Sequence, residues 1–136
     1  MNPGTPSVAF GAPGTEPRWT RSAKEGIGTA YHSSCRVWFT ISHGIINEIY
    51  YPNVDCPNTR DLQLLITDGE SFFHEERRDL EHKLEYPEKG VLYYRLTNSD
   101  PVGRYRIIKE VITDPHSSVF LMATKIEVPD EALRKK

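Results

Sequence analysis

The sequence lacks any long hydrophobic run and any strong excess of one charge. No stretch approaches the roughly 18 apolar residues that a membrane-spanning helix needs, and the first residues lack the pattern of an export signal. The 17 basic and 19 acidic residues leave a net charge of −2. An electropositive face for phosphate backbones is therefore not expected. We expect a cytoplasmic protein with neither nucleic-acid nor membrane partners.

Cysteine is also scarce. Cys35 lies in an apolar run and Cys56 in a loop rich in Pro and Asn, and their spacing specifies neither a disulfide framework nor a zinc motif. Free thiols are expected. The scattered histidines predict no metal site, and the absence of a glycine-rich phosphate loop leaves no cofactor to predict. These histidines are His32, His43, His74, His82 and His116.

The first part of the chain, residues 1–34, is dense in Pro, Gly, Ser and Thr and shows no period of 2 or 3.6. It is predicted to form an extended arm. Trp19, Ile27 and Tyr31 are the side chains that could pin this arm onto a folded body.

Short runs rich in β-branched and aromatic residues follow, each bounded by turn residues. This pattern is typical of strands. The strands are predicted at 35–41, 45–51, 60–67, 91–97, 104–113 and 119–128, with a start of another at 71–73. A loop is expected over 52–58 and a tight hairpin at Asp68-Gly69. The charged segment 74–85 fits a helical turn or a polar edge strand, and the edge strand is favoured.

About seven strands with apolar residues on both faces predict two stacked antiparallel sheets, an all-β sandwich over residues 35–128. Residues 129–136 are predicted to be a linker or the start of a missing region. The strand at 119–128 has no later strand to pair with. Its open edge predicts self-association.

Several segments together resemble the N-terminal domain of bacterial and archaeal glucoamylases and glucodextranases, of glycoside hydrolase family 15, from about Ala9 to Val128. The resembling segments are GAPGTEPRWTRSAKEGIGTA, RVWFTISHGIINEIYYPNVDCPNTRDLQLLITDGESFFHEE and IIKEVITDP. The most specific part is Gly44-x-x-x-Glu48-x-Tyr50-Tyr51-Pro52, followed by Asp55, Arg60-Asp61-Leu62 and Thr67-Asp68-Gly69.

The resemblance implies a partial, galactose-mutarotase-like super-sandwich that packs against an (α/α)6-barrel. In the family this barrel carries two catalytic glutamates and acts as an inverting, exo-acting glucosidase. The chain lacks the barrel and is shorter than the family's domain, so the resemblance implies a truncated, non-catalytic domain. We assign it no catalytic residue.

The candidate site residues are polar and aromatic side chains of the segment RVWFTISHGIINEIYYPNVDCPNTRDLQLLITDGESFFHEE, which is called the resembling motif below. They are predicted to form a pocket rim or a domain interface, with a role in binding α-glucan as a further option. The set is Trp38, Glu48, Tyr50, Tyr51, Asp55 and Arg60.

Structural alternatives exist for the same side chains. Tyr51 could pack in the core, Glu48 could pair with Arg60 or Arg36, and Arg60 could form a buried or a solvated pair with Asp61. A free carbohydrate-binding module, carried by exposed Trp38, Tyr50 and Tyr93, is the alternative function. A small hydrolase with its own carboxylate pair is a weaker one.

Overall fold

The computed structural model describes residues 23–129 and 131–134. Within these ranges the chain forms ten strands and two one-turn helices, all strand pairings being antiparallel. No helix of the described part is long and apolar enough to cross a bilayer. The all-β prediction is confirmed.

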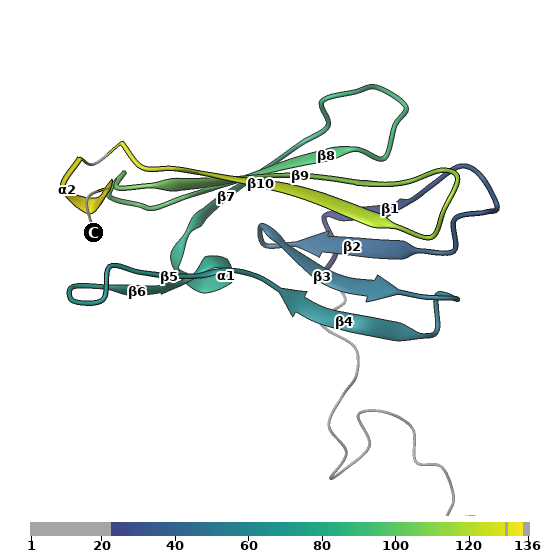
Figure 1. The fold of residues 1–136 in the computed structure, drawn as a ribbon, viewed down its shortest axis with the longest axis horizontal. Coiled ribbons are helices and arrows are strands. Elements are labelled where there is room, and N and C mark those ends of the chain that lie inside the picture. Colours follow the sequence, from purple (N-terminus) through teal and green to yellow (C-terminus); the bar gives the residue numbers. More distant parts are fainter. Residues whose placement is uncertain (1–22, 130, 135–136) are drawn as a thin grey trace, which may run out of the picture.

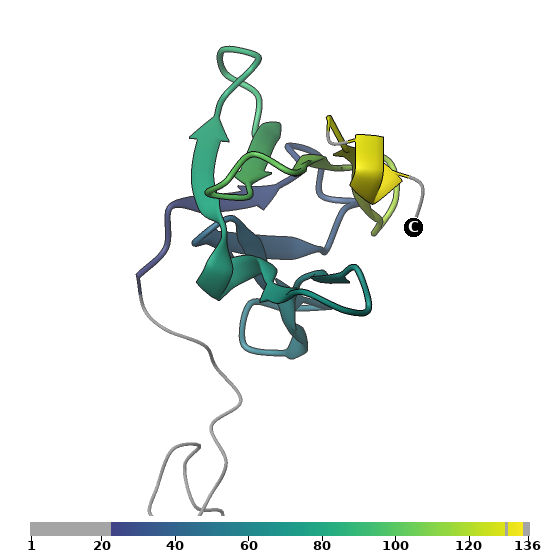
Figure 2. The same cartoon turned by 90° about the vertical axis from the view of Figure 1, so that its left-hand side faces the viewer.

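Two four-stranded sheets face each other as the layers of a sandwich (Figures 1 and 2). The first sheet has the order β1(Gly26–Thr29), β2(Trp38–Ser42), β3(Ile45–Tyr50), β4(Pro57–Leu62). The second has the order β10(Phe120–Glu127), β9(Arg106–Thr113), β8(Tyr94–Ser99), β7(Glu81–Glu85). All neighbours within each four-stranded sheet are consecutive in sequence, so each sheet is a meander of antiparallel strands.

A smaller unit connects the two layers. It contains the hairpin β5(Leu65–Thr67) and β6(Phe73–Glu75) and the helical turn α1(Glu76–Asp79), while α2(Glu131–Arg134) follows the last strand. Leu80, Tyr105 and Ile107 form the buried centre of a second apolar cluster beneath this unit.

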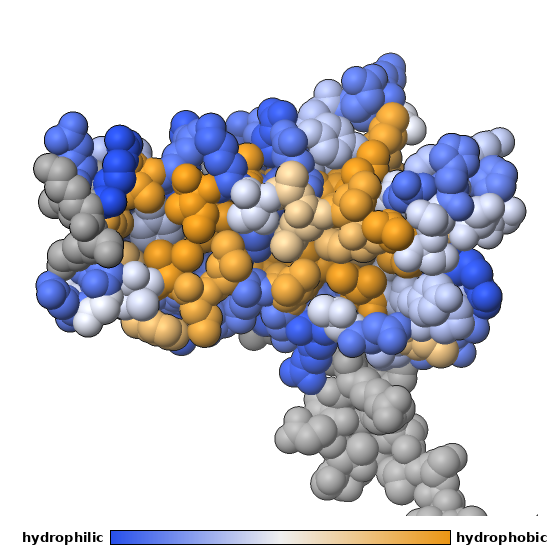
Figure 3. All heavy atoms as spheres, viewed as in Figure 1, coloured by the Kyte–Doolittle hydropathy of each residue, from blue (hydrophilic) through white to orange (hydrophobic). Residues whose placement is uncertain are grey.

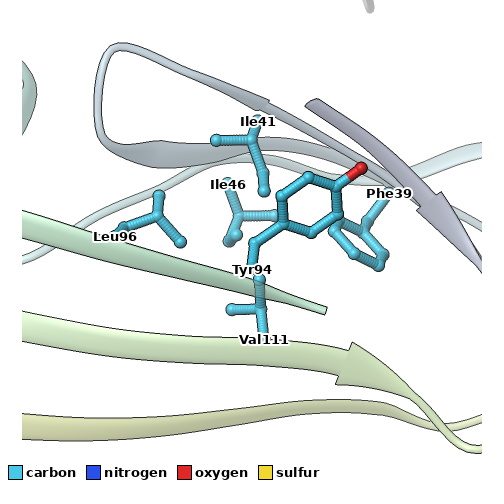
Figure 4. Packing of buried hydrophobic residues seen from close by; sticks show 6 residues of the cluster. All are labelled: Phe39, Ile41, Ile46, Tyr94, Leu96 and Val111. Atoms are coloured by element: carbon cyan, nitrogen blue, oxygen red, sulfur yellow. The ribbon is translucent and has the colours of Figure 1, made fainter. Parts of the chain in front are cut away.

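The main core lies between the two sheets, where six side chains from four strands meet (Figure 4). Burial of each large apolar side chain contributes roughly 1.5–3 kcal/mol relative to its exposure, so this cluster is the chief attraction between the layers. The six are Phe39, Ile41, Ile46, Tyr94, Leu96 and Val111.

The predicted strand at 60–67 is wrong, because the structure divides it into β4 and β5. Between these strands the Leu64 N–H donates to the Glu76 carboxylate at 2.8 Å, and the Leu64 carbonyl accepts from the Glu76 N–H at 3.1 Å. The backbone of Leu64 is thus bonded to α1 instead of a neighbouring strand. β4 also begins at Pro57, inside the loop predicted over 52–58.

The charged segment 74–85 contains both of the predicted alternatives. Residues 76–79 form the helical turn α1, and residues 81–85 form β7, an edge strand of the second sheet. The Asp79 carboxylate accepts a hydrogen bond from the Glu75 N–H at 2.7 Å, which closes the turn.

The predicted arm contributes a strand of its own, because β1 lies within residues 1–34 and pairs with β2. Ile27 and Tyr31 are exposed, so their predicted anchoring role is wrong. Gly28 is the close contact instead, since a Cβ at this position would overlap the Phe39 ring. Trp19 lies outside the described residues.

Candidate functional site

The centre of the resembling motif lies on β3, where one extra residue interrupts the pairing with β2. Ile41 pairs with Ile46, whereas the preceding residue of β2, Thr40, pairs with Glu48, which leaves Asn47 as the residue of a β-bulge. A bulge changes the face to which the following side chains point. Ile46 therefore belongs to the core, and Glu48 lies on the outer face of the first sheet with Thr40.

Glu48 is 1 % exposed although it lies on this outer face. Its Oε2 atom accepts hydrogen bonds from Lys24 Nζ at 2.7 Å, Thr40 Oγ1 at 3.3 Å and Tyr50 OH at 2.5 Å. Burial raises the pKa of Tyr50 well above its ordinary value, and the hydrogen bond to the Glu48 carboxylate raises it further. Glu48 is thus a buried anchor that joins β2, β3 and the segment before β1.

The contact with Lys24 differs from both predicted pairings of Glu48, which were with Arg60 and with Arg36. Arg60 lies opposite Glu48 in the register of β3 and β4, but its guanidinium is bonded to Asp61 at 3.4 Å. Side-chain exposures of 47 % for Arg60 and 24 % for Asp61 make this a solvated pair, so the buried alternative is wrong. Exposed pairs of this kind contribute roughly 0–1 kcal/mol.

Four of the predicted site residues occupy neighbouring positions on the outer face of the first sheet. Trp38 lies directly opposite Tyr50, and Arg60 lies opposite Glu48. Trp38 is 37 % exposed, so one aromatic ring of this cluster reaches the surface.

The other two predicted residues lie in the loop between β3 and β4. Tyr51 is 46 % exposed, which rules out a core position, and its bond to Pro52 is cis. Asp55 is exposed as well. The Asn58 side chain closes the loop by donating to the carbonyls of Tyr51 and Cys56 at 2.6 and 3.1 Å.

The comparisons with known proteins decide the family. The family model for glucodextranase domain N matches residues 9–135. The chain belongs to this family. A curated glucoamylase of Clostridium sp. (strain G0005) is 40 % identical over 119 residues, which cover 88 % of this chain and 17 % of the relative.

A solved structure gives the same result in three dimensions. The crystal structure of a bacterial glucoamylase complexed with acarbose matches this glucodextranase N domain with a TM-score of 0.79 at 38 % identity. The match covers 82 % of this chain and 17 % of that one. This chain therefore spans about a sixth of the length of either relative.

A second polar cluster of the glucodextranase N domain was missed by the sequence analysis. Lys109 and Glu76 form an ion pair at 2.5 Å, and both side chains are at most 1 % exposed. Asn98 Nδ2 donates to Glu76 Oε1 at 2.5 Å and to the Gly44 carbonyl at 2.8 Å, while its Oδ1 lies 3.1 Å from His82 Nδ1. The cluster ties the β2–β3 turn to α1 and the second sheet.

One sequence signal points to this cluster. Lys109 lies between Ile107 and Val111 in a strand whose alternate positions face the core, so alternation places its charge inside. Burial lowers the pKa of Lys109, and the neighbouring Glu76 carboxylate opposes this shift. Glu76 shows no such signal, because its burial depends on how α1 packs.

One hollow in the described part of the chain lies away from the resembling motif. Its volume is about 440 Å³, and none of the predicted site residues lines it. Tyr31, Val91 and Leu92 are among the residues that line this hollow, and all three are exposed. No group of three potential metal-ligating side chains occurs in residues 23–129 and 131–134, and the two cysteines are free thiols, as predicted.

Proposed function

We propose that this domain is the non-catalytic support of an (α/α)6 catalytic barrel in a glucoamylase-type enzyme that releases glucose from α-glucans. The observation that carries the proposal is the burial of Glu48. The most prominent carboxylate of the resembling motif is bonded to Lys24, Thr40 and Tyr50 within the domain. It is therefore used for structure.

The chemistry of glycoside hydrolysis explains why the burial of Glu48 bears on catalysis. An inverting glycosidase places two carboxyl groups roughly 6.5–9.5 Å apart on opposite sides of the substrate, with one of them reaching the glycosidic oxygen. Glu48, at 1 % exposure, has no surface to offer a sugar. Asp55 lies in an exposed loop, where its carboxylate contacts the Cys56 thiol and not a second carboxyl group. The family relationship supports a source of catalytic acids elsewhere in the enzyme.

The face that borders the barrel is proposed to be the outer face of the first sheet. Trp38 and Tyr50 present aromatic area there, and Tyr51 and Asp55 extend it through the next loop. Aromatic side chains provide large, rigid contact areas at low entropic cost, which suits a lasting interface between domains.

A fusion experiment tests this proposal. The chain is joined to the helical part of the Clostridium glucoamylase in place of that enzyme's own N-terminal region, and the melting temperature and glucose release are compared with those of the helical part alone. We expect stabilisation of the helical part and activity in the fusion only. Equal stability and activity with and without the domain would refute the proposal.

The proposed interface on the outer face of the first sheet is tested with two matched substitutions in the fusion. Trp38→Ala removes an exposed ring from the proposed interface, whereas Leu121→Ala removes an exposed side chain from the second sheet. Trp38→Ala should reduce the stabilisation of the helical part, while both isolated variant domains unfold like the wild type. A larger effect of Leu121→Ala would place the interface on the other sheet.

Carbohydrate binding by the domain alone is the second candidate, favoured by the exposed Trp38 ring opposite Tyr50. Tyr93, the third residue of this hypothesis, is only partly exposed. It directly precedes β8, which belongs to the second sheet. Calorimetric titration with maltooligosaccharides, isomaltooligosaccharides and trehalose decides between the candidates. Heat of binding that Trp38→Ala abolishes would favour the binding module, and flat titrations would remove it.

A further inference from the structure

The space between the two layers is chiefly apolar. Hydrophobic surface extends along the side between the layers in Figure 3, and hydrophilic residues cover the outer sides of both. The buried cluster of Lys109, Glu76 and Asn98 interrupts this apolar interior. Buried polar groups are costly unless each donor meets an acceptor. The hydrogen atoms at the edge of the cluster can therefore be assigned from the positions of the acceptors.

His82 lies at the edge of this cluster. It is directly opposite Asn98 in the register of β7 and β8, so the two side chains share a face of the second sheet. Its neighbours Glu81 and Lys83 are exposed and lie on the other face, as alternation along a strand requires. His82 itself is half-buried. The sheet thus directs the imidazole ring toward the buried cluster.

An oxygen atom faces each of the two ring nitrogens of His82. Nδ1 lies 3.1 Å from Asn98 Oδ1, and Nε2 lies 3.0 Å from the backbone carbonyl oxygen of Arg77 in α1. A backbone carbonyl accepts hydrogen bonds and cannot donate them, so the second contact requires a hydrogen on Nε2. The Arg77 guanidinium itself is bonded to Asp61 at 3.3 Å.

The orientation of the Asn98 amide is fixed by its other contacts. Its Nδ2 donates to the Gly44 carbonyl at 2.8 Å and to Glu76 Oε1 at 2.5 Å. Exchanging the amide oxygen and nitrogen would set an oxygen against these two acceptors and lose both hydrogen bonds. Asn98 therefore presents its oxygen to His82, and this contact requires a hydrogen on Nδ1 as well.

The β2–β3 turn packs directly against the pair of side chains. A Cβ added at Gly44 would lie 2.2 Å from Asn98 Oδ1 and 2.4 Å from His82 Nδ1. The titratable residue of this turn, His43, has its own ring nitrogen 2.5 Å from Ser42 Oγ. The turn therefore encloses the contact between the imidazole and the amide.

Two charged side chains act on His82 from the interior. The Glu76 carboxylate is linked to the imidazole through the Asn98 amide, which bonds one group on each side and favours a positive ring. Lys109 binds Glu76 at 2.5 Å and opposes a charge on His82. Burial lowers the pKa of Lys109, which weakens this opposition.

We propose that His82 is held as the doubly protonated imidazolium and acts as a pH-sensitive lock between β7, α1 and the β2–β3 turn. The charged ring donates to Asn98 and to the Arg77 carbonyl at the same time. Loss of one proton leaves a lone pair facing an oxygen, so one of the two contacts is broken. The folded domain then holds more protons than the unfolded chain, and its stability falls as the pH rises.

Nitrogen NMR of the labelled 136-residue chain tests the charge on the ring directly, with His74 as an internal comparison. The Nε2 atom of His74 faces a donor, the Arg104 guanidinium, at 3.4 Å, and its Nδ1 atom lies 2.8 Å from Tyr105 OH. His74 therefore keeps one nitrogen without hydrogen. At about pH 7 the spectra should show two N–H groups for His82 and one for His74. A single N–H group on His82 would overturn the proposal.

Urea unfolding at about pH 6 and about pH 8 measures the effect of the lock. Between these values the unfolding equilibrium constant should rise about tenfold more in the wild type than in His82→Gln, because a hydrogen bond from a charged group is lost. His74→Gln is the matched control and should keep the wild-type rise. An equal rise in the wild type and in His82→Gln would contradict the lock.

If His82→Gln does not fold, the NMR measurement on the wild-type chain decides the charge by itself. Neither measurement involves a helical barrel. Failure of the lock would therefore leave the proposed support function, which the fusion tests, unaffected.

Discussion

At the scale of single residues, Glu48 is the centre of the resembling motif. Its carboxylate accepts hydrogen bonds from Lys24, Thr40 and Tyr50. Lys24 precedes β1, so the contact fastens the start of the described chain to the first sheet. A buried charge is tolerated when it is paired and hydrogen bonded. The motif therefore preserves a structural anchor beside an aromatic surface.

Glu48→Gln should destabilise the domain by about 1–3 kcal/mol, because the mostly buried Lys24 ammonium loses its ion pair with Glu48. Denaturant unfolding of the two proteins measures the change. Asp55→Asn is the matched control, since Asp55 is exposed and belongs to the same motif. It should change the free energy of unfolding by less than about 0.5 kcal/mol. Equal effects would contradict the anchoring role.

The same substitution has a spectroscopic consequence at Tyr50. Glu48 contributes to the raised pKa of Tyr50 through its charge and its hydrogen bond, but burial is the larger cause. Glu48→Gln should therefore lower the Tyr50 pKa part of the way toward its ordinary value. Absorbance titration at alkaline pH, with Tyr50→Phe to identify the signal, measures the shift.

At the scale of elements, the turns are held by different means. The β2–β3 turn has a positive φ of 71° at Gly44, and its position is fixed by the Asn98 side chain, which binds the Gly44 carbonyl. The turn between β8 and β9 is held by Asp100, which binds the backbone and the guanidinium of Arg104. Asn98 is 54 residues from Gly44 in the sequence, whereas the contact between Asp100 and Arg104 is local.

Gly44→Ala should destabilise the domain by about 2–3 kcal/mol. The alanine Cβ would overlap Asn98 Oδ1 and His82 Nδ1, in addition to the strain of a left-handed backbone. Gly90→Ala separates the two effects, because Gly90 has a φ of 82° and nothing within 4 Å of the added Cβ. It should cost only the backbone strain of about 1 kcal/mol. Similar losses in both variants would show that contact with Asn98 is unimportant.

Asp100 should make stability depend on pH on the acid side. Its side chain is buried, and the hydrogen bonds from Arg104 hold its pKa below the ordinary 3.8, while burial opposes this shift. The folded state thus gains stability from ionised Asp100 above about pH 4 and loses it as the pH falls through the lowered pKa. Asp100→Asn should flatten this part of the curve.

Unfolding by urea at a series of acid pH values measures the Asp100 contribution. Arg104→Gln serves as a second variant, because it removes the donor that lowers the pKa and should weaken the same dependence. A wild-type acid profile retained in both variants would assign the dependence to other carboxylates.

At the scale of the whole molecule, the two layers are joined by one apolar cluster and one polar cluster. Phe39 is fully buried and packs edge-on against Tyr94 and Phe120 of the second sheet, with ring centroids 5.9 and 5.1 Å away. Lys109 and Glu76 join the second sheet to α1. Loss of either cluster should therefore affect both layers.

Phe39→Ala should destabilise the domain by about 3–5 kcal/mol, since a large cavity would open between the sheets. Tyr31→Ala is the control at a fully exposed aromatic residue and should change the free energy of unfolding by less than about 0.5 kcal/mol. Guanidinium unfolding, followed by fluorescence and circular dichroism, measures both. A loss below about 1 kcal/mol for Phe39→Ala would show that the layers do not depend on this ring.

Several features could be predicted from the sequence because they rest on local physical chemistry. Runs of β-branched and aromatic residues predicted strands at 35–41 and 45–51, where the structure has β2 and β3. Turn residues and β-branched runs gave the all-β class. Trp38 and Tyr50 were assigned to the candidate site, and the register places them opposite each other, although their role stays a prediction.

Where strands form and which family the motif resembles follow from the sequence alone, since both depend on short stretches of residues. What covers the charged groups follows only from the folded arrangement of the chain. The partner of Glu48 is Lys24, which is 24 residues distant, and the partner of Lys109 is Glu76, which is 33 residues distant. Such pairings depend on which layer each strand joins and on the bulge at Asn47. Local patterns cannot specify contacts that form only when separate strands are brought together.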